Sequence, residues 1–169
     1  MSEENNICKE SAYQKLYHST ANKIRNFMLY KCGSLELAED LCHEAFLRAW
    51  KNCAKITPDK AAAFLYRVAN NLVLDKVKHD KVVFQYKFQV KKSIEHESPE
   101  YQLEMKDFKT QLDEAISSLP EKERVVFLMS RIDKMTYKEI AEKLGLSVKA
   151  IEKRMQLALR AMRKMKFKI

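Results

Sequence analysis

Apolar residues recur at helical spacing along most of the chain. From Ser34 to Lys51 they form a single stripe, made of Ala38, Leu41, Cys42, Ala45, Phe46 and Ala49. From Lys60 to His79 they cover more than half of the helix circumference, which is typical of a central bundle helix. The pattern predicts an all-α fold.

Helix-breaking residues fall where these patterns begin or end. The chain has only two glycines and three prolines. Gly33 precedes Ser34, a residue type that caps helix N-termini, and Pro58 precedes the helix expected next. Pro99 and Pro120 bracket a further helical stretch.

One segment departs from the helical period. Residues 82–90 alternate apolar and polar positions as a strand does, but a lone strand would have no partner. The residues that follow are polar and without period, as in a flexible connection. We therefore predict two small helical domains, 1–81 and 101–169, joined by a linker at 82–100.

The strongest local signal lies near the C-terminus. Thr136 and Glu139 have the spacing of a capping box, Gly145 permits a tight turn, and Ser147 can cap the next helix. A short helix, a glycine-containing turn and a basic second helix predict a DNA-binding helix-turn-helix. The alternative is a helical hairpin whose charges are simply solvated.

The apolar positions of this second helix set its orientation. If Ile151 and Met155 face the core, one group of polar side chains faces a DNA groove and can reach base edges: Lys149, Glu152, Lys153 and Gln156. Arg154, Arg160, Arg163 and Lys164 are placed to contact phosphates.

Charge is segregated along the chain. The net charge is +9. Residues 60–92 carry 8 basic and 2 acidic side chains, residues 93–123 carry 3 and 9, and residues 124–169 carry 13 and 4. Two basic blocks separated by an acidic one indicate two polyanion-binding surfaces, although charge can also serve solubility alone.

Two helical faces carry candidate binding residues. Leu47 and Trp50 lie opposite the apolar stripe among acidic residues, a pattern equally consistent with a partner interface and with packing under a neighbouring helix. The Lys60–His79 helix carries a narrow polar strip that can meet bases and phosphates or be simply solvated, formed by Arg67, Asn70, Asn71, Asp75 and Lys78. Tyr66, Phe84 and Tyr86 are candidates for stacking on unpaired bases.

Several classes of site and protein are disfavoured. The cysteines Cys8, Cys32, Cys42 and Cys53 have no metal-binding spacing with one another or with histidines, so we expect no metal and no cofactor. Paired carboxylates and glycine-rich phosphate loops are missing, so we expect no enzyme. Without a signal sequence or membrane-length apolar stretch, we expect a cytoplasmic protein with reduced thiols.

Three segments, in this order, resemble the extracytoplasmic-function (group IV) sigma factors of the sigma-70 family. AEDLCHEAFLRAW is similar to their polymerase-binding helix, FLYRVANNLVLDKVKH to their promoter-melting helix, and the stretch from LPEKERVVF to LRAMRK to their region 4. The resemblance implies an alternative sigma factor, with core RNA polymerase (its β′ clamp helices and β subunit), promoter DNA and an anti-sigma factor as partners, and no membrane insertion.

The resemblance also implies roles for particular residues. It assigns polymerase binding to Asp40, Leu41, Glu44, Phe46, Leu47 and Trp50. It assigns capture of a flipped −10 base to the loop Asn52–Lys60. It assigns contact with the melted strand to the polar strip of the Lys60–His79 helix, and reading of the −35 element to the second helix of the helix-turn-helix. His43 and Glu152 depart from the usual family residues, so neither that polymerase contact nor the promoter sequence carries over. A stand-alone helix-turn-helix regulator is the alternative.

Overall fold

The computed structural model describes residues 6–79 and 98–165. Seven α-helices occur in these ranges, together with one 3-10 turn at Cys53–Lys55, and the described residues contain no strand. The helices are α1 (Glu10–Cys32), α2 (Leu35–Lys51), α3 (Ala61–His79), α4 (Pro99–Ser118), α5 (Glu121–Arg131), α6 (Tyr137–Leu144) and α7 (Val148–Lys164). The predicted all-α fold is confirmed.

Local capping explains where several helices begin and end. The Ser34 hydroxyl accepts a hydrogen bond from the Leu37 N–H at 3.3 Å, and Gly33 ends α1 in the left-handed conformation at φ 72°. Thr136 and Glu139 form the expected capping box at α6. These positions confirm the predicted starts of α2 and α6.

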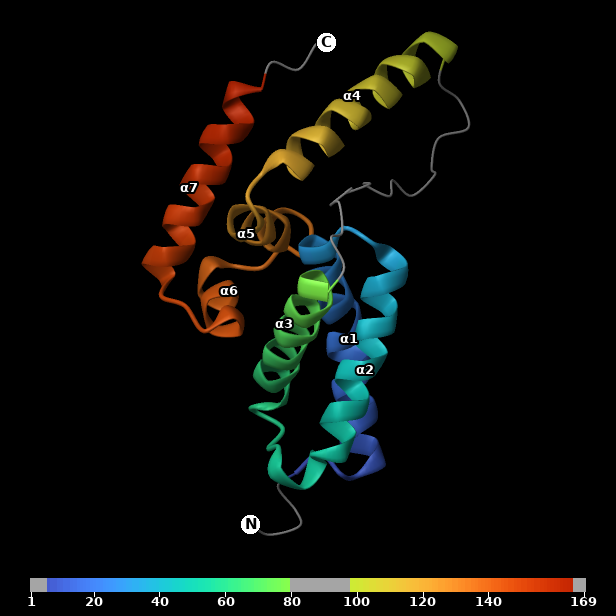
Figure 1. The fold of residues 1–169 in the computed structure, drawn as a ribbon, viewed down its shortest axis with the longest axis vertical. Helices are drawn as coiled ribbons and strands as arrows, with labels where there is room; N and C mark the ends of the chain where they lie inside the picture. The colour runs from blue at the N-terminus through green and yellow to red at the C-terminus, as the bar shows by residue number, and fades with distance from the viewer. Residues whose placement is uncertain (1–5, 80–97, 166–169) are drawn as a thin grey trace.

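The first three helices form a bundle, with α1, α2 and α3 each packed against the other two (Figure 1). Its core holds Ile24, Phe27, Ala45, Leu65 and Ala69, all nearly inaccessible to solvent. Burial of such side chains contributes roughly 1.5–3 kcal/mol for each large one. The bundle therefore supplies a rigid platform for the outward faces of α2 and α3.

The C-terminal helices form a second, smaller core. Helix α5 packs on both α6 and α7, and Ile140, Ile151 and Met155 are buried between them. This half also packs on the bundle, through α5 against α1 and α6 against α3 (Figure 1). Helix α4 projects away from both cores, with Tyr101, Leu103 and Met105 exposed.

Two expectations fall partly or wholly outside the described residues. The alternating segment 82–90 is one of them, so its assignment to a linker stays a prediction. The predicted linker extends to residue 100, whereas α4 begins at Pro99 with the Ser98 hydroxyl as its cap. The domain limits are otherwise not tested and stay a prediction.

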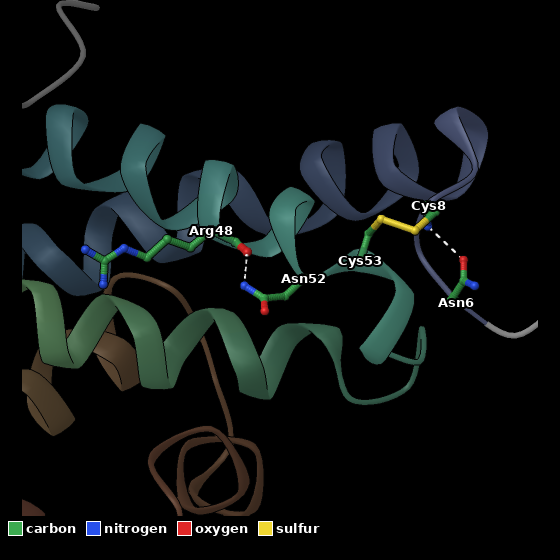
Figure 2. The surroundings of a disulfide bond; sticks show 5 residues. All are labelled: Asn6, Cys8, Arg48, Asn52 and Cys53. Atoms are coloured by element: carbon green, nitrogen blue, oxygen red, sulfur yellow. Dashed lines mark hydrogen bonds between the residues drawn. A yellow bond between two sulfur atoms is a disulfide. The ribbon is translucent and has the colours of Figure 1, made fainter. Parts of the chain in front are cut away.

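The prediction that all four cysteines carry reduced thiols is wrong for two of them. Cys8 and Cys53 form a disulfide, with their Cα atoms 4.9 Å apart (Figure 2). Only Cys32 and Cys42 are free, and both are buried. Sequence spacing did not reveal the pair because the two residues are 45 positions apart and meet only through the packing of the N-terminal segment on the loop after α2.

Candidate nucleic-acid interface

The outer face of α2 presents two large apolar side chains to solvent. Leu47 is 54% exposed and Trp50 is 45% exposed. The Trp50 ring meets the edge of Tyr13 from α1 at 4.9 Å between centroids, and the Tyr13 hydroxyl donates to the Phe46 carbonyl oxygen at 2.7 Å. Trp50 is thus held from one side while the rest of it stays free. Anchored, exposed aromatic residues are typical of interface hot spots.

The other predicted polymerase-binding residues divide into two groups. Asp40 is exposed, and Leu41 and Glu44 are partly exposed, with Glu44 accepting from Arg48 Nε at 2.8 Å. Phe46 lies elsewhere, in the core, where it is 4% exposed and packs on the Tyr17 ring at 4.9 Å. In the described structure Phe46 supports this face from beneath and takes no place on the surface.

The polar strip runs along one side of α3. Arg67, Asn71, Asp75 and Lys78 are exposed. Asn70 is different, because its side-chain oxygen accepts from Lys31 Nζ at 2.8 Å. The same ammonium group pairs with Glu121 of α5 at 2.6 Å. The strip is therefore open for most of its length and engaged at Asn70.

Tyr66 does not provide the stacking surface expected of it. Its side chain is 2% exposed and packs against the Phe27 ring at 5.2 Å between centroids. Lys143 of α6 lies over the same ring, with Nζ 5.4 Å from its centroid. Burial is the main cause that raises the pKa of the Tyr66 hydroxyl. Phe84 and Tyr86 lie outside the described residues.

An open cavity of about 730 Å³ lies between the bundle and the second half, beside the contacts through which they pack. Basic side chains from both halves line it, with Lys55, Lys60 and Arg67 on one side and Lys143 and Arg154 on the other. Arg67 and Arg154 were predicted to meet different promoter elements. The structure brings them to the same cavity, which the sequence did not indicate.

A buried arginine joins α5 to the end of α1. Arg124 donates from Nε to the Tyr30 carbonyl oxygen at 2.9 Å and from a terminal nitrogen to the Lys31 carbonyl oxygen at 3.4 Å. It also donates to the Leu119 carbonyl oxygen at 2.9 Å. These carbonyls lie at helix ends, where a cation is favourable. Burial is the main cause that lowers the pKa of Arg124.

A carboxylate completes this contact between the halves. Asp133 Oδ1 accepts from the Asn26 side-chain amide at 2.9 Å and from the Tyr30 hydroxyl at 3.1 Å. Burial raises the pKa of the Asp133 carboxyl, although the two hydrogen bonds oppose that shift. Neither Asp133 nor Arg124 was selected from the sequence. The available signal was Arg124 itself, four residues before Leu128 on the apolar face of α5.

Helices α6 and α7 form the expected helix-turn-helix. Gly145 takes the left-handed conformation at φ 65°, and the Ser147 hydroxyl caps α7 by accepting from the Ala150 N–H at 3.2 Å. Ile151 and Met155 are buried, and the predicted groove-facing residues are exposed: Lys149, Glu152, Lys153 and Gln156. Arg160 is exposed as well, whereas Arg154 is partly buried toward the cavity.

Other kinds of site find no support in the part of the chain that the structure describes. No group of three or more histidine, cysteine, aspartate or glutamate side chains there has a geometry that could hold a metal ion. Within the same residues, no helix has the length and apolar character needed to cross a membrane.

Similar proteins point to one family. Residues 16–82 match the family model "Sigma-70 region 2", and residues 109–162 match "Sigma-70, region 4". The chain is 25% identical to the ECF RNA polymerase sigma factor SigW of Bacillus subtilis over 92% of this chain and 89% of SigW. It is 27% identical to the ferric citrate uptake sigma factor FecI of Escherichia coli, over 83% of each chain.

Solved structures agree on the fold. CnrH, in complex with the cytosolic domain of CnrY, matches with a TM-score of 0.62 at 22% identity, over 92% of this chain and 88% of CnrH. RpoE of Bartonella quintana, in complex with the anti-sigma factor NepR, matches with a TM-score of 0.61 at 16% identity, over 90% of this chain and 95% of RpoE. Two family models in the expected order, together with similar curated proteins such as SigW, show that the chain belongs to the extracytoplasmic-function sigma factors of the sigma-70 family.

Proposed function

We propose that this chain is an alternative sigma factor, which binds core RNA polymerase and directs it to promoters through their −10 and −35 elements. The observation that carries the proposal is the ordered pair of region 2 and region 4 matches within one chain. The role is not catalytic, because RNA synthesis belongs to the polymerase and the chain contributes binding. Its place of action is the cytoplasm, where the polymerase transcribes.

The outer face of α2 is the proposed site for the clamp helices of the polymerase β′ subunit. Leu47 and Trp50 supply the apolar anchors, and Asp40 and Glu44 supply negative charge around them. Apolar anchors within a charged rim combine affinity with orientation. Leu41 is partly exposed on this face. Phe46 acts from the core, because its carbonyl oxygen and its ring both contact Tyr13, and the Tyr13 ring in turn packs against Trp50.

The DNA contacts are divided between the two halves. The strip on α3 is proposed to meet the melted −10 strand, where amides can pair with bases and Arg67 and Lys78 can meet phosphates. The loop Asn52–Lys60 is proposed to receive a flipped base. The outward face of α7 is proposed to read the −35 element in the major groove.

An anti-sigma factor is a further proposed partner. RpoE of Bartonella quintana was solved with the anti-sigma factor NepR, and CnrH with the cytosolic domain of CnrY. The similar fold of this chain and its cavity between the two halves support a partner of that kind. Regulation by such a protein would act on sites that the polymerase and the DNA also need.

Transcription with purified components tests the proposed function. Core polymerase is incubated with fragmented genomic DNA, with and without the chain, and the transcripts are sequenced. We expect new 5′ ends that share an upstream element only when the chain is present. The alternative, a stand-alone regulator, predicts tight binding of duplex DNA by the free chain and no new start sites with core polymerase.

A further inference from the structure

The disulfide fastens the N-terminal segment to the loop proposed to capture the −10 base. Cys8 precedes α1, and Cys53 begins the short 3-10 turn Cys53–Lys55 directly after α2 (Figure 2). Their Cα atoms are 4.9 Å apart, a separation at which two cysteines can bond without backbone movement. The bond therefore fits the backbone of the two segments as the structure describes it.

Weaker contacts reinforce the same attachment. The Ile7 N–H donates to the Ile56 carbonyl oxygen at 3.2 Å, and both side chains are buried. Ile56 and Lys55 also line the cavity between the two halves. The loop is thus bound covalently on one side and faces the proposed DNA path on the other. When the disulfide is reduced, one backbone hydrogen bond and the packing of Ile7 still hold the loop.

The bonded cysteines are the accessible ones. Cys8 and Cys53 are partly exposed, whereas Cys32 and Cys42 are buried. Burial is the main cause that raises the pKa of the Cys32 and Cys42 thiols, which disfavours their reactive thiolate forms. Thiol chemistry is therefore directed to Cys8 and Cys53.

We propose that Cys8 and Cys53 form a reversible thiol–disulfide switch that sets the order of the base-capturing loop. This proposal rests on the function proposed above. In the cytoplasm, a disulfide is typically transient and redox-sensing, because the compartment keeps thiols reduced. The bond forms when oxidation reaches the pair and breaks when reducing conditions return.

The chemistry is an exchange with a low-molecular-weight disulfide. One thiolate of the pair attacks a sulfur of that molecule and releases its first thiol, which leaves a mixed disulfide on the protein. The second cysteine, as thiolate, attacks the protein sulfur of the mixed disulfide and releases the second thiol. The two cysteines lose two electrons and two protons, and the small disulfide gains both to become two thiols.

Oxidation is expected to favour promoter opening. A loop already held in one shape loses less conformational freedom when it receives a base, so the ordering cost of binding is smaller. In the reduced protein only the Ile7–Ile56 hydrogen bond and the packing of Ile7 attach the N-terminal segment to the loop, so the loop loses more conformational freedom as the base enters. We expect the effect on promoter melting and not on polymerase binding or −35 reading, because neither the outer face of α2 nor the recognition helix α7 is part of the loop.

The test follows promoter opening at fixed thiol–disulfide ratios. Holoenzyme is assembled with the oxidised and the reduced full chain, and permanganate reactivity is followed over time on a promoter from the genomic transcription experiment. If one or two side chains are ordered in advance, we expect oxidised holoenzyme to open about 3–10 times faster. Cys8→Ser should open at the reduced rate in both buffers, while the control Cys42→Ala should keep the full response.

The outcomes separate the switch from the proposed function. Equal opening rates for the oxidised and reduced chain, with equal binding to core polymerase, would overturn the switch. The same holds if Cys8→Ser keeps the redox response. If the chain does not bind core polymerase at all, the proposed function fails. Hydrogen exchange at residues 53–57 then decides the switch alone, since faster exchange in the reduced protein supports it and equal exchange contradicts it.

Discussion

The outer face of α2 and the polar strip of α3 belong to the same three-helix bundle, yet they are presented differently. On α2, Leu47 and Trp50 face solvent, and neither the second half nor any other described residue covers them fully. On α3, Asn70 is bonded to Lys31, which is itself paired with Glu121 of the second half. One face is free for a partner, and the other is partly committed to an internal contact.

The difference comes from where the second half packs. Helix α5 lies on α1 and α6 lies on α3, so the second half borders the strip and leaves the α2 face open (Figure 1). If the two faces act as proposed, polymerase can bind the described arrangement directly. At Asn70, the melted strand would have to displace Lys31 of α1, which is also paired with Glu121 of α5. The predictions below test this contrast, from the largest expected effect to the smallest.

The largest effect is expected on the open face. Leu47→Ala combined with Trp50→Ala should reduce affinity for core polymerase roughly 100- to 1,000-fold, because two hot-spot side chains of about 2 kcal/mol each are removed. Pull-down and circular dichroism report binding and folding. The matched control is Leu74→Ala with Val77→Ala, two comparably exposed apolar residues on α3. Normal binding by the α2 variant would remove these residues from the interface.

The second effect concerns the packing of the second half on the bundle, beside the polar strip of α3. Arg124→Met should weaken the packing of the second half on the bundle by about 2–4 kcal/mol, because hydrogen bonds from a buried charged group to the Tyr30 and Lys31 carbonyls are lost. Energy transfer between dyes at Glu36 and Arg163 should report a longer distance. Arg131→Met, at the exposed end of the same helix, is the control. An unchanged distance would mean that Arg124 does not hold the halves together.

Much of the bundle and of the helix-turn-helix could be predicted because their signals are local. Ser34 caps α2 from the adjacent position, and Thr136 and Glu139 cap α6 within one turn. Arg124, Asp133 and the disulfide depend on segments brought together by packing. The hydrogen bonds of Arg124 reach 94 residues along the chain, a separation over which helical periodicity carries no information. For the same reason the sequence placed Tyr66 at a surface that packing covers.

The third effect tests the assignment of residues on the recognition helix α7. Loss of a base contact should change sequence preference, whereas loss of a phosphate contact should weaken binding to all sequences. Glu152→Ala or Lys153→Ala should cost about 1–3 kcal/mol at the native upstream element and relax the preference at one or two base pairs. Arg160→Ala or Arg163→Ala should weaken all promoters alike and reduce the salt slope by about one. Selection on a randomised element across a salt series distinguishes them. A new motif from the arginine variants alone would show that α7 is rotated relative to our assignment.

The smallest effect lies in the turn that positions Asp133 against α1. Lys134 takes the left-handed conformation at φ 57°, which costs a residue with a side chain roughly 1–2 kcal/mol. Lys134→Gly should therefore raise the free energy of unfolding by about 1 kcal/mol, measured by urea denaturation. The same change at Lys138, inside α6, should lower it by about 0.5–1 kcal/mol. If Lys134→Gly instead lowers the free energy of unfolding, the Lys134 side chain stabilises the fold by more than its left-handed conformation costs.

Permanganate footprinting of one promoter with core polymerase, with the chain alone and with both together tests the central claim most directly. If the chain is a sigma factor, we expect reactive thymines in the −10 region only when both proteins are present. The chain recognises the promoter, and melting occurs only in its complex with core polymerase. Protection of duplex DNA by the chain alone, with no reactive thymines when core polymerase is added, would contradict the account.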